Sequence, residues 1–391
     1  MIEISRGTPS EFEEVIQFIN DVFSAGGRPH DFPQMYPNLY RPTEKCMHAL
    51  LNLREDGVIK GSVLVLPRTL SINGETLKIY GIGSVATHPE ARGRGFMSRM
   101  LTQAADEMKA EGVAMAMLGG RRKRYNHFGY EIAGNAFNFD LNRWDVTGTY
   151  PDFDASAFQF RPFTPDETEL VDTLYAMYLR QPVHYCYDRD EYVLRFFSDE
   201  NFQPYAVYDR AGTPVGCLAL GNVGNGRTPI REVVVAEDRL LEDVLFSFAM
   251  QTDNRLALKL APWQLASVPR MLRIGTGLTG YADAQWKMLD WPQTLQKLLT
   301  FKGSYADLED GTLVLDIEGC GRIAVTVAGR KASVEPTAAP ADLTFSLLDA
   351  VYTLAGPTPS ALVGLQLPRA VQRLFASWFP LPLMHFDTER V

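Results

Sequence analysis

The sequence predicts a mixed α/β (α+β) protein with two similar mixed-sheet domains followed by a smaller α+β domain. The chain has 391 residues, enough for two or three domains at about 150 residues each. Hydrophobic residues make up 46% and charged residues 22% of the chain, as is usual in folded globular proteins. The order helix, antiparallel strands, helix, strand occurs twice, which indicates a degenerate structural repeat.

Turn and helix-end signals define the elements of the first unit. Asp56-Gly57 and Asn73-Gly74 are turn dipeptides, and Asn-Gly is the strongest short hairpin signal. Gly112 stands where it would end a helix. The predicted elements are a helix over 11–23, strands over 58–66, 69–72 and 77–87, a helix over 96–110 and a strand over 113–118.

A stretch rich in Asp, Pro and Gly over 145–154 predicts a linker to the second unit. We therefore expect three domains, at 1–145, 146–284 and 285–391. The elements predicted for the second are a helix over 167–179, strands over 205–208, 215–221 and 231–236, and a helix over 240–250. The third has a helix over 291–299, strands over 312–317, 322–327 and 331–335, and a helix over 345–354.

Composition excludes several function classes. The formal net charge of −9 argues against nucleic acid or an anionic membrane as the main partner and favours amines and other cations. We find no apolar run near the roughly 18 residues that span a bilayer. The four cysteines show no C-x-x-C spacing and predict reduced thiols in a cytoplasmic protein, and the six histidines form no H-E-x-x-H metal motif.

The segment from Gly83 to Met100 carries the clearest chemical signal. A strand ends at Thr87, and Arg92-Gly93-Arg94-Gly95 then opens directly into a helix. Backbone N–H groups of a glycine-rich turn at a helix N-terminus form a cradle for phosphate oxygens. The spacing fits neither a Walker loop nor a dinucleotide-binding fingerprint.

This segment resembles the acetyl-coenzyme A (acetyl-CoA) loop of the GNAT superfamily of N-acetyltransferases, Arg/Gln-x-x-Gly-x-Gly/Ala. Arg92, Gly95 and Met97 occupy its three defined positions, and Met97 departs from the small residue of the pattern. Further along, Tyr125-x-x-Phe128-Gly129-Tyr130 resembles an element of the Eis-type (enhanced intracellular survival) acetyltransferases. That family combines a GNAT domain, a degenerate second copy and a sterol-carrier-protein-like domain, so the resemblance covers essentially the whole chain.

The resemblance implies that acetyl-CoA is a substrate and that no metal is needed. The strand before the loop would splay from its neighbour and offer backbone groups to the pantetheine arm. The residues expected at the coenzyme are Ser84, Val85, Thr87, Arg92, Gly93, Arg94, Gly95, Phe96, Met97 and Gly120.

By the same resemblance, Tyr125 protonates the departing thiolate. A phenol with a pKa of about 10 suits this role, and the basic residues at 122–124 are expected to lower that pKa. The family uses its C-terminal carboxylate as the base, a role that would fall on Val391. Because this chain continues past the aromatic residue at 386, Asp387 or Glu389 could replace that carboxylate. His30 and Asp31 are further alternatives, since the region after the first helix flanks the acceptor cleft in this fold.

These features predict an N-acetyltransferase in which a neutral primary amine attacks the thioester directly. Cys46 is far from both motifs in sequence, so we expect no acyl-enzyme. The predicted acceptor is a small cationic molecule, aminoglycoside-like or polyamine-like. The alternatives are a protein acetyltransferase acting on lysines or N-termini and a non-catalytic protein that binds acyl-CoA or a lipid. The resemblance also implies a homo-oligomer, a hexamer in the family.

The second unit predicts no coenzyme site of its own. Its helix begins after Glu237-Asp238 without a glycine, and two carboxylates there would repel a pyrophosphate. We expect this copy to wall the acceptor cleft of the first.

Overall fold

Three sheets organise the chain in the computed structural model, which describes all residues except 198–201, 275–276, 283, 358–363, 365 and 390–391. The first sheet has nine strands, in the order β1-β2-β3-β5-β6-β16-β7, with β4 paired to β5 and β10 paired to β4. These strands are β1 Ile2–Arg6, β2 Leu50–Glu55, β3 Val58–Leu66, β4 Thr69–Ile72, β5 Glu75–Thr87, β6 Met115–Leu118, β7 Glu131–Ala133, β10 Val183–Tyr185 and β16 Ala284–Met288.

Helices cover both faces of the first sheet. Phe96, Met100 and Leu101 of α4 pack on one face, against Val63 and Ile82 among others. A separate apolar cluster joins α1, α2 and α3 to the opposite face. The helices of this domain are α1 Phe12–Ser24, α2 Phe32–Met35, α3 Glu44–His48, α4 Phe96–Ala110 and α5 Arg122–Tyr125.

The second sheet repeats the plan of the first, in the order β15-β8-β14-β13-β12-β11-β9. Strands β11, β12 and β13 run antiparallel, α9 follows, and β14 returns parallel to β13, as α4 and β6 follow β5. Its strands are β8 Ala136–Leu141, β9 Phe158–Pro162, β11 Phe202–Asp209, β12 Pro214–Gly221, β13 Arg227–Val235, β14 Arg255–Leu260 and β15 Leu278–Tyr281. Its helices are α6 Arg143–Thr149, α7 Thr168–Tyr178, α8 Arg189–Phe197, α9 Leu241–Gln251 and α10 Met271–Ile274.

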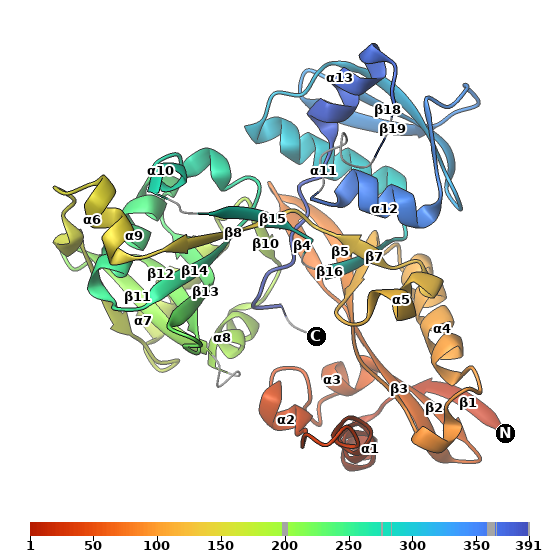
Figure 1. The fold of residues 1–391 in the computed structure, drawn as a ribbon. Helices are drawn as coiled ribbons and strands as arrows, with labels where there is room; N and C mark the ends of the chain where they lie inside the picture. Colours follow the sequence, from red (N-terminus) through yellow and green to blue (C-terminus); the bar gives the residue numbers. More distant parts are fainter. Residues whose placement is uncertain (198–201, 275–276, 283, 358–363, 365, 390–391) are drawn as a thin grey trace.

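The third domain packs helices on a four-stranded sheet, in the order β19-β18-β17-β20. The chain enters it through α11 and leaves it through a C-terminal segment, which runs back between the first two domains (Figure 1). The elements are α11 Trp291–Tyr305, β17 Gly311–Ile317, β18 Gly321–Ala328, β19 Lys331–Pro336, β20 Leu343–Phe345, α12 Leu347–Ala355 and α13 Arg369–Trp378.

The predicted helices and strands are present, but the sheets do not follow the predicted domain limits. The linker expected over 145–154 is wrong at its start, because α6 covers it as far as Thr149. The Asn142 side chain caps that helix by accepting from the backbone N–H of Trp144 at 2.9 Å. The sheets also exchange strands across the expected limits: β8 precedes 145 but lies in the second sheet, and β16 returns to the first.

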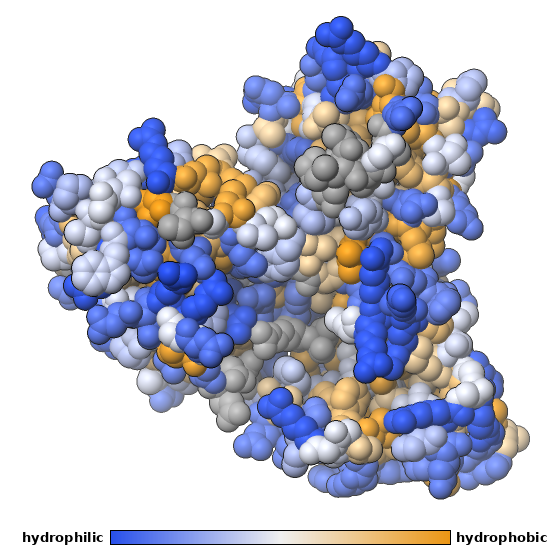
Figure 2. Space-filling model, in the orientation of Figure 1, coloured by the Kyte–Doolittle hydropathy of each residue, from blue (hydrophilic) through white to orange (hydrophobic). Residues whose placement is uncertain are grey.

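The visible surface is largely hydrophilic, with hydrophobic residues in separate groups, and it is indented between the second domain and the other two (Figure 2). No helix among the described residues is long and apolar enough to cross a membrane.

Candidate functional site

The first sheet opens into a fork at β5 and β6. Their parallel pairing ends at Ile82 and Leu118, whereas β5 runs on to Thr87 paired only with β3. A bulge lies within this extension: Gly83 pairs with Leu64 and Ala86 with Ser62, so two residues, 84 and 85, oppose one. Ser84 there has a left-handed φ of 35°. Ser84, Val85 and Thr87 therefore border the open side of the fork.

The loop after β5 has the conformation that its sequence predicts. Gly93 and Gly95 have φ values of 77° and 76°, which side chains other than glycine adopt at a cost. Gly95 caps α4, whose 15 residues point the positive end of the helix dipole at the loop. A groove of about 530 Å³ follows the loop, and we call it the loop groove. It is lined by Val22, Val85, Thr87, Ala91, Arg92, Gly93, Gly95, Phe96, Met97, Ser98 and Arg124.

The two arginines of the loop differ. Arg94 donates to Glu55, with 2.8 Å between Nη1 and Oε2, and its guanidinium lies 4.6 Å from the centre of the Phe96 ring. Arg94 does not line the loop groove, so of these two arginines Arg92 is the one that lines it, together with Arg124 of α5. The expectation that both arginines serve a phosphate is therefore not supported by where Arg94 lies.

Tyr125 is packed against the backbone of Gly120. A Cβ atom at Gly120 would stand 2.8 Å from Cε2 of Tyr125, and the φ of Gly120 is +137°. The carbonyl of Gly120 accepts from Nε2 of Gln285 at 2.8 Å. Gln285 lies on β16 and is buried, and sequence reasoning missed it because only the strand exchange brings it here.

Burial determines the protonation of Tyr125. The side chain is 6% exposed, and burial raises the pKa of its phenol, with Arg124 opposing the shift. Arg122 is bound to Glu131, with 2.5 Å between Nε and Oε1. The expectation that residues 122–124 hold this pKa below its ordinary value is wrong, since desolvation outweighs them. The phenol is protonated at neutral pH.

A second hollow lies between the first domain and α8. This interdomain cavity of about 580 Å³ combines side chains around α3 and the end of β3 with side chains of the second domain. Lys45 and Glu191 pair across it. It is lined by Arg6, Asn38, Leu39, Arg41, Glu44, Lys45, Cys46, His48, Ala49, Val65, Leu66, Pro67, Arg68, Tyr80, Glu111, Tyr187, Glu191, Leu194 and Arg195.

The residues that the sequence analysis discussed as a nucleophile or a base lie in different places. Cys46 lines the interdomain cavity despite its distance from both motifs in sequence. His30 does not line it: Nδ1 lies 2.8 Å from the carbonyl of Arg28. Asp31 caps α2 by accepting from the N–H of Gln34 at 3.2 Å. Sequence reasoning missed Tyr187, which comes from the second domain.

The C-terminal segment is buried or half-buried as far as Glu389, so it is not the disordered tail that its polar residues suggest. Asp387 lies 3.1 Å from Nη1 of Arg231 and 3.1 Å from Nζ of Lys259. Although burial acts against it, these two cations hold the pKa of Asp387 below its ordinary value. Glu389 accepts from Tyr187. Val391, the predicted base, lies outside the described residues.

Comparison with known proteins gives the family of the first domain. Residues 3–133 match the model of an acetyltransferase (GNAT) domain. The protein is an N-acetyltransferase. A domain of this kind takes its acyl group from an acyl-CoA, and the fork and loop groove lie within the matched residues. A search of curated proteins gave no match.

Solved structures share the fold of the whole N-acetyltransferase chain. A probable N-acyltransferase from Enterococcus faecalis is 17% identical, with 98% of each chain covered and a TM-score of 0.70. A GCN5-related N-acetyltransferase from Kribbella flavida is 17% identical, with the same coverage and a TM-score of 0.68. Eis1 from Mycobacterium abscessus is 14% identical over 100% of both chains, with a TM-score of 0.69. These likenesses show the tandem mixed-sheet fold.

The second domain of the N-acetyltransferase differs at the position of the loop. The residues after β13 form a short 3-10 helix, Asp238–Leu240, ahead of α9, and Glu237 there is bound by Arg239, with 2.7 Å between Oε2 and Nε. Across the described residues, no group of three or more His, Cys, Asp or Glu side chains is arranged to hold a metal.

Proposed function

We propose that this N-acetyltransferase transfers the acetyl group of acetyl-CoA to a primary amine of a small molecule by direct attack. The observation that carries the proposal is the fork between β5 and β6. Its open strand, Gly83–Thr87, leads into a left-handed Gly93/Gly95 loop at the N-terminus of α4. An unpaired strand edge can bind the amides of the pantetheine arm of coenzyme A, and a helix N-terminus attracts the pyrophosphate of the coenzyme.

In this proposal the coenzyme lies along the loop groove. Ser84, Val85 and Thr87 bind the pantetheine arm through their backbone, and the backbone of residues 92–97 holds the pyrophosphate together with the side chain of Arg92. Gly120 contributes by leaving room for Tyr125. Val85 and Thr87 line the same groove as Arg92 and Gly93, which supports one continuous path.

The reaction then proceeds at the fork. The lone pair of the neutral amine attacks the thioester carbon, and the carbonyl electrons move onto oxygen, where a backbone N–H near Val85 stabilises the oxyanion. Collapse re-forms the carbonyl and breaks the carbon–sulfur bond. Tyr125 gives its proton to the departing thiolate, and the attacking nitrogen loses one proton to a base. Tyr125 is protonated before the step, as a general acid must be, since its pKa lies above the ordinary value of a phenol.

The base is a carboxylate of the C-terminal segment. Arg231 and Lys259 bind Asp387 at 3.1 Å each, closer than the 3.6 and 3.8 Å that separate Glu389 from Arg195 and Arg68. Nδ1 of His30 lies 2.8 Å from the carbonyl of Arg28. Glu389 and the carboxylate of Val391 are left for the role. Glu389 is joined to the interdomain cavity by Tyr187, whose hydroxyl donates to it.

The acceptor enters through the interdomain cavity, which lies on the α3 side of the first domain. The net charge of −9 favours a cationic amine, aminoglycoside-like or polyamine-like, by long-range attraction. The cavity lining itself holds five Arg or Lys side chains and three Glu side chains, so the carboxylates at 44, 111 and 191 are the groups that would bind such an amine. Nε of Arg41 is buried in the cavity wall without a hydrogen-bond partner among the described residues. It is therefore a donor for an oxygen of the acceptor, and R41Q should raise the acceptor KM while leaving the acetyl-CoA KM unchanged.

The test is release of free thiol from acetyl-CoA with aminoglycosides, polyamines and lysine peptides, for the wild type and Y125F. Acceptor-dependent release that falls at least tenfold in Y125F supports the proposal. Release with peptides alone would instead indicate a protein acetyltransferase. Coenzyme binding without release from any acceptor would indicate an acyl-CoA-binding protein and refute the proposal.

We further infer that the enzyme is of the Eis type, with a third domain of the sterol-carrier kind and a homo-oligomeric, hexameric assembly in the cytoplasm. The full-length similarity to Eis1 supports the first part. Light scattering of the purified chain would test the assembly, and a fluorescent fatty acid would test lipid binding by the third domain.

A further inference from the structure

The second domain has its own strand fork. The parallel pairing of β13 with β14 ends at Ile230 and Leu258. Strand β13 nevertheless continues to Val235 and β14 to Leu260. This is the geometry that β5 and β6 have in the first domain, but here no glycine loop follows the fork.

The chain's own C-terminal segment occupies this second fork. Arg231 and Lys259 are the residues that directly follow the last strand pair, one on each strand. Both bind the carboxylate of Asp387, each at 3.1 Å, and Lys259 also donates to the carbonyl of His385. The carboxylate therefore lies at the point where the two strands separate.

Arg195 of α8 holds the next two residues of the segment. Its guanidinium donates twice to Glu232, at 2.6 Å each, and once to the hydroxyl of Thr388 at 3.2 Å. The same group lies 3.6 Å from a carboxylate oxygen of Glu389. Three aromatic rings surround it, with centres 4.5 to 4.8 Å away, and it is only 4% exposed. The rings belong to Tyr178, Tyr192 and Phe196.

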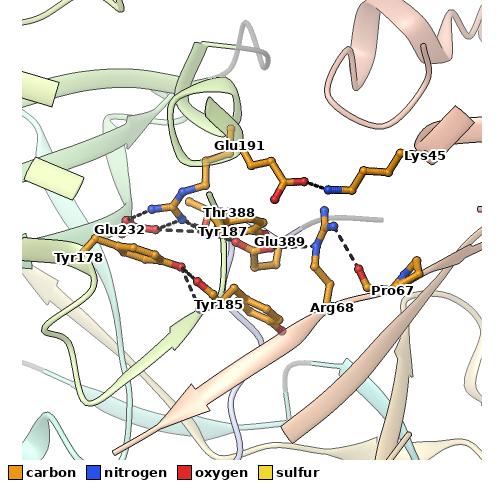
Figure 3. A network of polar contacts seen from close by, with 11 residues as sticks. Lys45, Pro67, Arg68, Tyr178, Tyr185, Tyr187, Glu191, Glu232, Thr388 and Glu389 are labelled. Carbon is orange, nitrogen blue, oxygen red and sulfur yellow. Dashed lines mark hydrogen bonds and ion pairs between the residues drawn. The ribbon is translucent and has the colours of Figure 1, made fainter. Parts of the chain in front are cut away.

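Glu389 connects the C-terminal segment to both the first and the second domain (Figure 3). It is 7% exposed and accepts from the hydroxyl of Tyr187, which also lines the interdomain cavity. From the first domain, Nε of Arg68 approaches it to 3.8 Å. The charged groups that face it are thus Arg68, Arg195 and, across the shared guanidinium, Glu232.

We propose that the second domain uses its strand fork as a holder for the C-terminal segment, and that Arg195 is the positioning residue that sets Glu389 beside the interdomain cavity. The catalytic half of this inference rests on the proposed function. Two hydrogen bonds from Arg195 are enough to pair the carboxylate of Glu232. The guanidinium also donates to Thr388, which links it to the C-terminal segment. The guanidinium of Arg195 is planar and enclosed by aromatic rings, so its N–H donors point in fixed directions. These donors therefore fix where the C-terminal segment lies.

Hydrogen exchange tests the holder without any assay of activity. The variants are R195M, R195K and T388V, and the control is R189M on the same helix, whose partner is Asp172 on the surface. We expect amide exchange over 386–389 to be at least tenfold faster in R195M and T388V than in the wild type or R189M. Unchanged exchange in T388V would overturn the proposal even if R195M fails to fold, because T388V leaves the Arg195–Glu232 pair intact.

Kinetics test the positioning. We expect kcat to fall at least tenfold in R195M and to recover in part in R195K, with the acetyl-CoA KM within twofold of the wild type. R195M combined with E389Q should be no slower than E389Q alone, since both changes act through one carboxylate. Additive losses would mean that Arg195 supports the fold only. A wild type that releases no thiol would refute the proposed function, whereas the exchange result would still decide the holder.

Discussion

Replacing Gly120 by alanine tests whether the position of the Tyr125 ring controls the rate. The added Cβ would stand 2.8 Å from Cε2 of Tyr125, and ordinary contact begins at 3.4 Å, so the ring must move by about 0.6 Å. Displacements of about 1 Å at a reacting group cost about a hundredfold in rate. We therefore expect kcat of G120A to fall by about tenfold, equivalent to about 1.4 kcal/mol of activation free energy.

The backbone adds a separate cost in stability. The φ of +137° at Gly120 is strained for alanine by about 1–3 kcal/mol, so G120A should also melt at a lower temperature. The adjacent Gly119 is the matched control, because a Cβ there meets nothing within 4 Å and its φ lies outside the left-handed range. Thiol release should be measured well below the melting temperature of either variant. Equal kcat values for G120A and G119A would refute the reasoning.

Three further predictions concern charged groups. R92Q should weaken coenzyme binding about tenfold in calorimetry at low salt, and R94Q less than threefold, because Glu55 already holds Arg94; equal effects would contradict the assigned roles. E389Q should remove the acid-side limb of the kcat–pH profile, which in the wild type lies above the ordinary carboxyl pKa because burial raises the pKa of Glu389; an unchanged limb would exclude Glu389 as the base. D387N should lower the free energy of unfolding by about 2 kcal/mol at pH 7, within the usual range for hydrogen bonds to charged groups. This loss of stability should shrink as the pH falls through the lowered pKa of Asp387. Urea unfolding at pH 7 and pH 3 checks this, and a loss of the same size at both would contradict the ion pairing.

Local signals made the first domain predictable. Strands β3 and β4 and helix α4 have the bounds that the sequence predicts, because turn glycines mark their ends. Asn73 and Gly74 have the φ values of 49° and 83° that a tight hairpin needs. The loop could also be placed, since glycine at two alternate positions before a helix allows the left-handed conformation that this turn adopts.

The parts that the sequence did not predict depend on contacts between distant residues. Nothing near Gln285 indicates that its strand returns to the first sheet and places its amide on Gly120. Thr388 and Glu389 belong to a polar segment that is ordinarily exposed. Their burial depends on partners that are distant in sequence, Arg195, Tyr187 and Arg68. The predicted direction of the pKa shift of Tyr125 was wrong, because the sequence shows the neighbouring charges but not the burial of the phenol.

The exchange of β8 and β16 has a consequence for how the chain is made. The first sheet needs β16 between β6 and β7, yet about 150 residues separate β7 from β16. At roughly 5–20 residues per second on the ribosome, the edge of β6 stays open for on the order of ten to thirty seconds, until the second domain has emerged. An unpaired apolar edge of this kind invites association with other chains. The nascent protein is therefore most vulnerable to aggregation midway through synthesis, and a fragment ending at residue 145 would stay in that state permanently.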